Sequence, residues 1–158
     1  MYMKTFMLDT SIINDIVSHP DYTRISRQLR GHTDDGTVEF RVIHIVEDEL
    51  SLTPDKKRKR RDELLRICRK ITVTIPSESF IVGKSRLGMA KVGAGESLRQ
   101  ILGASGPGQM NDALIVESAS NSDYLVTSDP GQARRGRKYL GDDRVIDSLD
   151  GLLKMLGT

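Results

Sequence analysis

Two aspartates frame the stretch from Met110 to Pro130, whose pattern predicts a helix followed by a short buried strand. Asp112 lies at the start of the apolar helical run, and Asp129 comes just after the strand Tyr124–Thr127. In an open parallel sheet, ligands bind outside the carboxyl ends of the strands and often at helix N-termini. Taken alone, each aspartate is more simply explained as structural, either by the helix dipole or by turn formation.

Two further carboxylates are predicted to reach the same edge of the sheet. Asp9 follows a first strand, Lys4–Leu8, and Glu49 lies in a helix after a second strand, Val38–Ile43. Converging carboxylates repel one another strongly in a partly desolvated cleft. A hard divalent cation such as Mg²⁺ or Mn²⁺ balances such charge, lowers the pKa of a bound water and offsets charge on a phosphodiester transition state. The four acids therefore indicate phosphodiester chemistry.

Strands and helices alternate along the chain, which predicts one α/β domain over residues 1–158 with a mostly parallel sheet covered on both faces. The expected strands are Lys4–Leu8, Val38–Ile43, Ile71–Ile75, Tyr124–Thr127 and Arg144–Ile146. The expected helices begin after Asp9, at about Pro20, after Ile43, in the basic segment, near Ser79, near Glu96, at Asp112 and at Leu149. A polar turn is predicted over Gly31–Gly36, after the helix that begins near Pro20.

Composition excludes several classes of protein. Aromatic residues make up only 4% of the 158 and Trp is absent, which argues against base stacking on aromatic platforms. Cys68 is the only cysteine, so an internal disulfide and a Cys-cluster zinc site are excluded. No apolar run approaches the roughly 18 residues of a membrane span. The first ten residues lack the pattern of a signal peptide, and we expect a cytoplasmic protein with no membrane partner.

Four short motifs carry a resemblance to a known family. They are LDTSIIND at 8–15, VEDEL at 46–50, NDALIVESA at 111–119 and LVTSD at 125–129. In this order they resemble the acidic motifs of PIN-domain nucleases, and most closely those of bacterial VapC-type toxins. The resemblance implies a PIN-like three-layer α/β/α fold. It also implies that Asp9, Glu49, Asp112 and Asp129 bind Mg²⁺ or Mn²⁺, assisted by Thr10 and Ser128 through hydrogen bonds to the ligands or to water.

The family's activity supplies the functional expectation. PIN-type toxins cleave RNA, usually as homodimers, and are silenced by a cognate antitoxin protein. We therefore expect a metal-dependent endoribonuclease, with a non-catalytic RNA- or protein-binding module as the alternative and DNA cleavage as a weaker one. The motif VEDEL leaves Glu47, Asp48 and Glu49 open as the second acid, and Glu49 is chosen because it precedes Leu50. The glycine-rich segment 83–109 is longer than a compact toxin needs.

Basic residues form the expected contact with the RNA backbone. The segment Asp55–Lys70 carries a net charge of +6, which leaves −4 on the remainder of the chain. Such a segment is most often a solvated helix face, but it can also bind phosphates without sequence preference. The candidates in this segment are Lys56, Lys57 and Arg58. Three more, Arg134, Arg135 and Arg137, follow Asp129.

Overall fold

The structure is a computed structural model, which describes residues 2–71, 73–76, 90–93 and 110–157. Its main sheet is parallel throughout and has the strand order β3-β2-β1-β6-β7. These strands are β1 (Lys4–Leu8), β2 (Val38–Val42), β3 (Arg69–Lys70), β6 (Tyr124–Val126) and β7 (Val145–Ile146). The predicted α/β class with a parallel sheet is confirmed.

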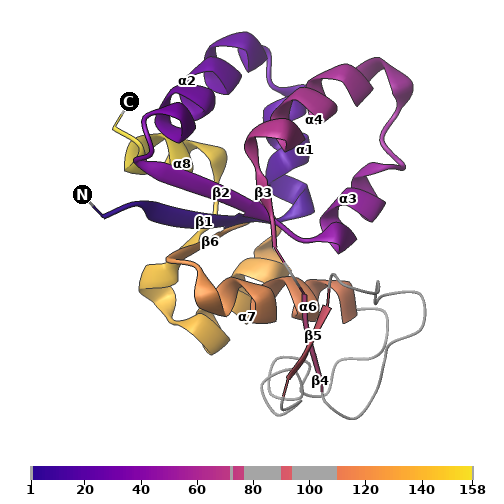
Figure 1. The fold of residues 1–158 in the computed structure, drawn as a ribbon, viewed down its shortest axis with the longest axis vertical. Helices are drawn as coiled ribbons and strands as arrows, with labels where there is room; N and C mark the ends of the chain where they lie inside the picture. Colours follow the sequence, from indigo (N-terminus) through magenta and orange to yellow (C-terminus); the bar gives the residue numbers. More distant parts are fainter. Residues whose placement is uncertain (1, 72, 77–89, 94–109, 158) are drawn as a thin grey trace.

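Helices cover both faces of this sheet (Figure 1). The helices α1 (Thr10–Ser18), α2 (Tyr22–Asp34) and α4 (Asp55–Ile67) lie on one face, and α6 (Met110–Ser118) and α7 (Pro130–Leu140) lie on the other. The chain also forms α3 (His44–Leu50), α8 (Leu149–Met155) and the short 3-10 turns η2 (Ala119–Asn121) and η3 (Asp142–Arg144). The arrangement is compatible with the expected three-layer α/β/α fold.

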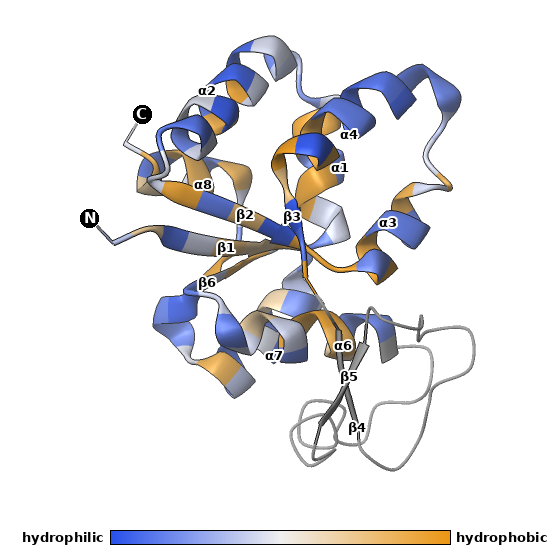
Figure 2. Cartoon of the chain, in the orientation of Figure 1, coloured by the Kyte–Doolittle hydropathy of each residue, from blue (hydrophilic) through white to orange (hydrophobic). Residues whose placement is uncertain are grey.

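Buried apolar residues form the core between the layers. The outward faces of the helices are largely hydrophilic (Figure 2). The centre of the sheet carries an aromatic row, in which Phe6 is in register with Phe40 on one side and Tyr124 on the other. The ring centroids lie 5.8 Å and 5.1 Å from that of Phe6. Aromatic pairs at such distances add to the stabilisation from burial, so this row holds the three central strands together.

The strand order fixes where a ligand site can form. From β1 the chain moves outward to β2 and then β3, after which it returns to place β6 and β7 on the opposite side of β1. The loops after β1 and β6 therefore diverge toward opposite faces of the sheet. Ligands of open α/β sheets bind outside the carboxyl ends of the strands at such a crossover. Asp9 and Asp129 follow these two strands.

The expected strand Ile71–Ile75 was wrong in its bounds. The structure places Arg69–Lys70 at the edge of the main sheet, and β4 (Val73–Pro76) instead pairs in parallel with β5 (Ala90–Gly93) in a separate two-stranded sheet. The N–H of Ile71 still donates to Val42 O at 2.9 Å. Two exposed basic side chains suit an edge strand, which faces water on one side.

Helix α2 differs from its predicted end. The helix continues to Asp34 through most of the stretch that we expected to be a turn, and the chain reverses at Gly36, whose φ is 69°. Glycine adopts this left-handed backbone conformation readily and is common just after the end of a helix. The helices expected near Ser79 and Glu96, and most of the segment 83–109, lie outside the described residues. In the part that is described, no helix is long and apolar enough to span a membrane.

Helix α7 packs closely on β6 and β7 through a glycine. A Cβ atom on Gly136 would lie 2.8 Å from Leu125 Cδ2 and 3.1 Å from Val145 Cγ2, and the side chain of Leu125 is fully buried. Gly31 in α2 makes a matched control, because a Cβ there would meet nothing within 4 Å. Both glycines lie in helices, so an alanine at either gains about 0.5–1 kcal/mol of helix propensity.

We therefore expect Gly31→Ala to stabilise the protein and Gly136→Ala not to. Crowding of a packed interior costs roughly 1–3 kcal/mol, and this should separate the two variants in free energy of unfolding. Urea denaturation followed by circular dichroism measures the difference. Equal stabilisation by both substitutions would show that α7 does not pack on the sheet at Gly136 as described.

Candidate functional site

Asp9 is a buried carboxylate at the carboxyl end of β1. It is 5% exposed and is the N-cap of α1, where its Oδ1 accepts the Thr10 N–H at 2.8 Å. Its Oδ2 accepts the hydroxyls of Ser11 at 2.9 Å and Thr127 at 2.7 Å. Burial raises the pKa of Asp9 and the charge of Glu49 adds to this, while the three hydrogen bonds oppose it.

Two hydroxyls join the ends of β1 and β6. Thr127 Oγ1 donates to Asp9 and accepts the Asp129 N–H at 3.2 Å, while Ser11 Oγ accepts the Ser128 N–H at 3.0 Å. The two hydroxyl oxygens are themselves 3.1 Å apart. Sequence reasoning missed Ser11 and Thr127 as site residues. The available signal was a hydroxyl residue two positions from Asp9 and another two positions from Asp129, where Thr127 directly follows the strand β6.

Glu49 comes to the same edge from α3. Its Oε2 accepts the hydroxyl of Thr10, and its Oε1 accepts Asn111 Nδ2 at 2.9 Å. Of the neighbouring acids, Glu47 forms an ion pair with Lys70 at 3.1 Å, and Asp48 is exposed. Glu49 is thus the acid of this motif that contacts residues from the first and third motifs. Asn111 was not among the predicted site residues.

Asp112 lies in the first turn of α6 and faces α7. Its Oδ2 is 3.4 Å from Arg135 Nη1, and its backbone carbonyl accepts Gln132 Nε2 at 3.0 Å. Burial and the charge of Asp9 raise the pKa of Asp112, and Arg135 lowers it. The charges of Glu49 and Asp129 also raise it. The four predicted acids are therefore close enough for Asp112 to experience the charge of each of the others.

Asp129 completes the set from the opposite side of the crossover. It is exposed and forms the N-cap of α7, where its Oδ1 accepts the Gln132 N–H at 2.8 Å. Of the predicted supporting residues, Thr10 contributes its hydroxyl to Glu49, whereas Ser128 contributes its backbone N–H to Ser11. The site is thus assembled from the ends of β1 and β6, the last turn of α3 and the first turns of α1, α6 and α7.

The oxygen atoms at this edge are of the chemical type that binds a hard divalent cation. Carboxylate and amide oxygens are the ligands that Mg²⁺ and Mn²⁺ prefer. Asn111 Oδ1, beside Glu49, is a buried acceptor that lacks a hydrogen-bond donor within the described part of the chain. As the described side chains stand, no group of three or more His, Cys, Asp or Glu residues is arranged to hold a metal ion. The four acids are close enough for their charges to interact, but their side chains are not arranged as a set of metal ligands.

The six basic candidates lie on two helices on opposite faces of the sheet, α4 and α7 (Figure 1). On α4, Lys56 is exposed, Lys57 Nζ donates to Ser18 Oγ at 2.7 Å, and Arg58 pairs with Asp55 at 2.7 Å. On α7, Arg134 is exposed, Arg137 pairs with Asp147 at 2.7 Å, and Arg135 contacts Asp112. The structure thus brings Arg135 to the acids and divides the candidates into two surfaces.

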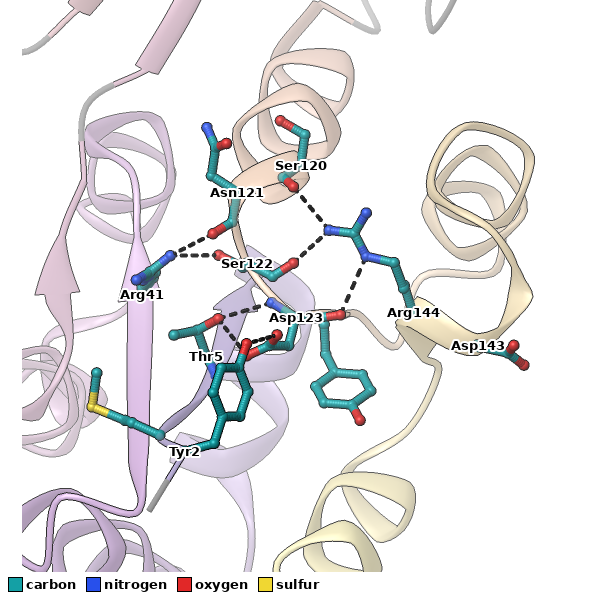
Figure 3. A pocket seen from close by; sticks show the side chains of 11 residues that line it. Tyr2, Thr5, Arg41, Ser120, Asn121, Ser122, Asp123, Asp143 and Arg144 are labelled. Atoms are coloured by element: carbon teal, nitrogen blue, oxygen red, sulfur yellow. Dashed lines mark hydrogen bonds between the residues drawn. The ribbon is translucent and has the colours of Figure 1, made fainter.

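A separate hollow of about 680 Å³ lies at the opposite edge of the sheet, where the strands begin (Figure 3). Its two guanidinium groups are engaged with the protein itself. Arg144 binds backbone carbonyls from Ala119 to Asp123, and Arg41 binds Asn121 O at 2.8 Å. These contacts close the turn between α6 and β6, so we assign this hollow a role in the fold.

Comparison with known proteins returned no match, whether with family models, curated proteins or solved structures.

Proposed function

We propose that this protein is a divalent-metal-dependent endoribonuclease of PIN type, which hydrolyses RNA phosphodiester bonds. The observation that carries the proposal is the convergence of Asp9, Glu49, Asp112 and Asp129 around the crossover between β1 and β6. These acids come from four separate segments of the chain and are linked by shared hydrogen-bond partners. Thr10 contacts both Asp9 and Glu49, Thr127 contacts Asp9 and the Asp129 N–H, and Gln132 contacts Asp129 and the Asp112 carbonyl. Carboxylates brought together at such an edge call for a cationic ligand.

Each residue has a definable part in this reaction. A bound Mg²⁺ or Mn²⁺ supplies Lewis-acid stabilisation of the phosphodiester and a water of lowered pKa. Asp9, Glu49, Asp112 and Asp129 are the residues that would hold the ion. Hydroxyls of Ser11 and Thr127 fix the Asp9 carboxylate, and Thr10 and Asn111 fix Glu49. Such supporting hydrogen bonds set the orientation of the ligand oxygens.

The partners are proposed on the resemblance of the motifs. We propose RNA as the substrate, held through backbone phosphates by basic residues of α4 and α7. We further propose that the protein is the toxin of a toxin–antitoxin pair, acts as a homodimer and is silenced by a cognate antitoxin. Binding through phosphates would weaken steeply as salt concentration rises.

The three acids of α3 offer a matched test of this function. Incubation of labelled RNA with purified protein should give cleavage that depends on Mg²⁺ or Mn²⁺ and stops when EDTA is added. Glu49→Gln should lower the cleavage rate by about 100-fold or more, since loss of a metal ligand removes several kcal/mol of transition-state stabilisation. Asp48→Asn makes the same change of charge one residue away, at an exposed position, and should cleave like the wild type.

Three results would contradict the proposal. Cleavage that persists in EDTA, or that is equal in wild type and Glu49→Gln, would mean that these acids do not support the reaction. RNA binding without cleavage, unchanged by Mg²⁺, would favour a non-catalytic binding module. The pairing of Arg135 with Asp112 favours that alternative, because the guanidinium of the protein itself balances part of the acidic charge and a metal ion is less needed. A DNA strand of the same sequence, assayed in parallel, tests the specificity for RNA.

A further inference from the structure

Arg135 brings a positive charge to the acidic edge from within the chain. Its guanidinium lies 3.4 Å from the Asp112 carboxylate, and its side chain is only 14% exposed. Asp112 is also the acid on which the charges of Asp9, Glu49 and Asp129 act. One guanidinium therefore offsets part of the repulsion among four carboxylates.

The position of this guanidinium is fixed by a buried neighbour. Arg135 Nη1 also donates to Gln132 Oε1 at 3.2 Å, one helical turn away on α7. Gln132 is 1% exposed, and its amide Nε2 donates to the Asp112 carbonyl at 3.0 Å. The backbone N–H of Gln132 donates to Asp129 Oδ1. The first turns of α6 and α7 are thus joined by a set of contacts that holds Arg135 beside the acids.

We propose that Arg135 is the internal counter-ion of the acidic edge, which a divalent cation replaces at Asp112 when it binds. This inference rests on the proposed function, because it supposes that the four acids form a cation site. The contact has the properties of one that can be exchanged. Its separation is long for a hydrogen bond, and the Asp112 side chain is 44% exposed.

A role as counter-ion differs from the role in RNA binding that the sequence suggested for Arg135. In the free protein the guanidinium competes with the metal ion for Asp112, so it lowers the metal affinity. Once a metal ion has taken its place at Asp112, the planar guanidinium can bind the phosphate of a substrate beside that ion, because guanidinium groups match phosphate oxygens in geometry. Cation binding and phosphate binding would then be linked through one side chain.

Calorimetric titration of Mn²⁺ into three proteins tests the inference without an activity assay. The proteins are the wild type, Arg135→Gln and Arg134→Gln. Arg135→Gln should bind Mn²⁺ more tightly by roughly two- to fivefold, the value of a partly exposed ion pair that no longer competes. Arg134→Gln removes the same charge from the adjacent, exposed position and should change the Kd clearly less, because it leaves the contact with Asp112 in place.

Thermal melting adds a second reading on the same proteins. Without metal, Arg135→Gln should melt below the wild type, because the acids lose their counter-ion. Mn²⁺ at one fixed concentration well above both Kd values should raise its melting temperature by more than that of the wild type, since the stabilisation grows with the logarithm of the ratio of ligand concentration to Kd. If Arg135→Gln fails to fold, Arg135→Lys is the second variant, because it keeps the positive charge and loses the planar guanidinium. Its Mn²⁺ affinity should lie at or slightly above that of the wild type.

The outcomes separate this inference from the proposed function. If the wild type binds Mn²⁺ and Arg135→Gln binds it equally well or more weakly, the counter-ion role is overturned and the metal site still stands. An equal gain in Mn²⁺ affinity for Arg134→Gln would mean that only the net charge of the protein matters, and this would also overturn the counter-ion role. Absence of Mn²⁺ binding in both the wild type and Arg135→Gln would overturn the metal site itself, and the counter-ion role with it.

Discussion

Asp9→Asn is expected to abolish Mn²⁺ binding and to lower the rate of metal-dependent RNA cleavage by about 100-fold or more. Asp9 is the most buried of the four acids, and its two oxygens already accept hydrogen bonds from Thr10, Ser11 and Thr127. An ion bound there would meet a carboxylate of fixed orientation. The amide has nearly the same shape but carries no charge, so it offers the cation a much weaker ligand. Calorimetry and a gel assay of RNA cleavage measure the two losses.

The same substitution should leave the fold intact. Burial and the nearby charge of Glu49 both disfavour the ionised form of Asp9, as the raised pKa indicates. A neutral amide removes that unfavourable charge. Its Oδ1 can still accept the Thr10 N–H, and its Nδ2 can donate to the Ser11 and Thr127 hydroxyl oxygens in place of accepting from them. We expect the free energy of unfolding in the absence of metal to equal or exceed that of the wild type, as is common where function needs clustered charge. A variant that binds Mn²⁺ like the wild type would place the metal elsewhere.

Thr127→Val is expected to weaken both the fold and the metal site, although Thr127 is not among the proposed ligands. Its buried hydroxyl donates to Asp9 Oδ2 and accepts the Asp129 N–H. Valine has the same shape but leaves both groups without this partner. Asp9 Oδ2 keeps the hydroxyl of Ser11, so we expect the free energy of unfolding to fall by about 1 kcal/mol, the lower end of the cost of removing a partner from a buried polar group. Loss of a group that orients a ligand typically lowers metal affinity by about 10- to 100-fold.

Thr127→Ser is the matched control, because it keeps the hydroxyl and removes only a methyl group. Serine should retain the Mn²⁺ affinity of the wild type within a small factor, while its stability falls modestly because a buried methyl is lost. Urea denaturation and calorimetry on the two variants separate the packing of the side chain from its hydrogen bonds. Equal Mn²⁺ affinities for the valine and serine variants would mean that the Thr127 hydroxyl does not orient Asp9.

These expectations share one physical basis in the strand crossover. The N–H of Asp9 donates to Val126 O at 3.0 Å, and beyond this bond the described ends of β1 and β6 diverge and their backbone groups no longer pair with each other. Ser11 and Thr127 fill that role by accepting the N–H groups of Ser128 and Asp129. The side chains that close the crossover also hold Asp9, so stability and the candidate site depend on the same hydroxyls.

The sequence by itself determined the local elements and the acids that follow them. Alternation of apolar residues identifies β2, and the buried runs identify β1 and β6, because each strand's pattern depends on a few consecutive residues. The aspartates at positions 9 and 129 could be assigned to strand ends for the same reason, and both prove to be helix N-caps. Parallel pairing then placed them at one edge of the sheet.

Only the tertiary structure decided which side chains meet at that edge. The hydrogen bond between Thr127 and Asp9 joins residues 118 positions apart, and that between Asn111 and Glu49 joins residues 62 apart. The pairing of Arg135 with Asp112 depends on how α7 packs beside α6, which no local pattern encodes. The split of the expected third strand into β3 and β4 has the same origin. Local patterns specify which residues form an element, whereas contacts between elements arise from packing the whole chain.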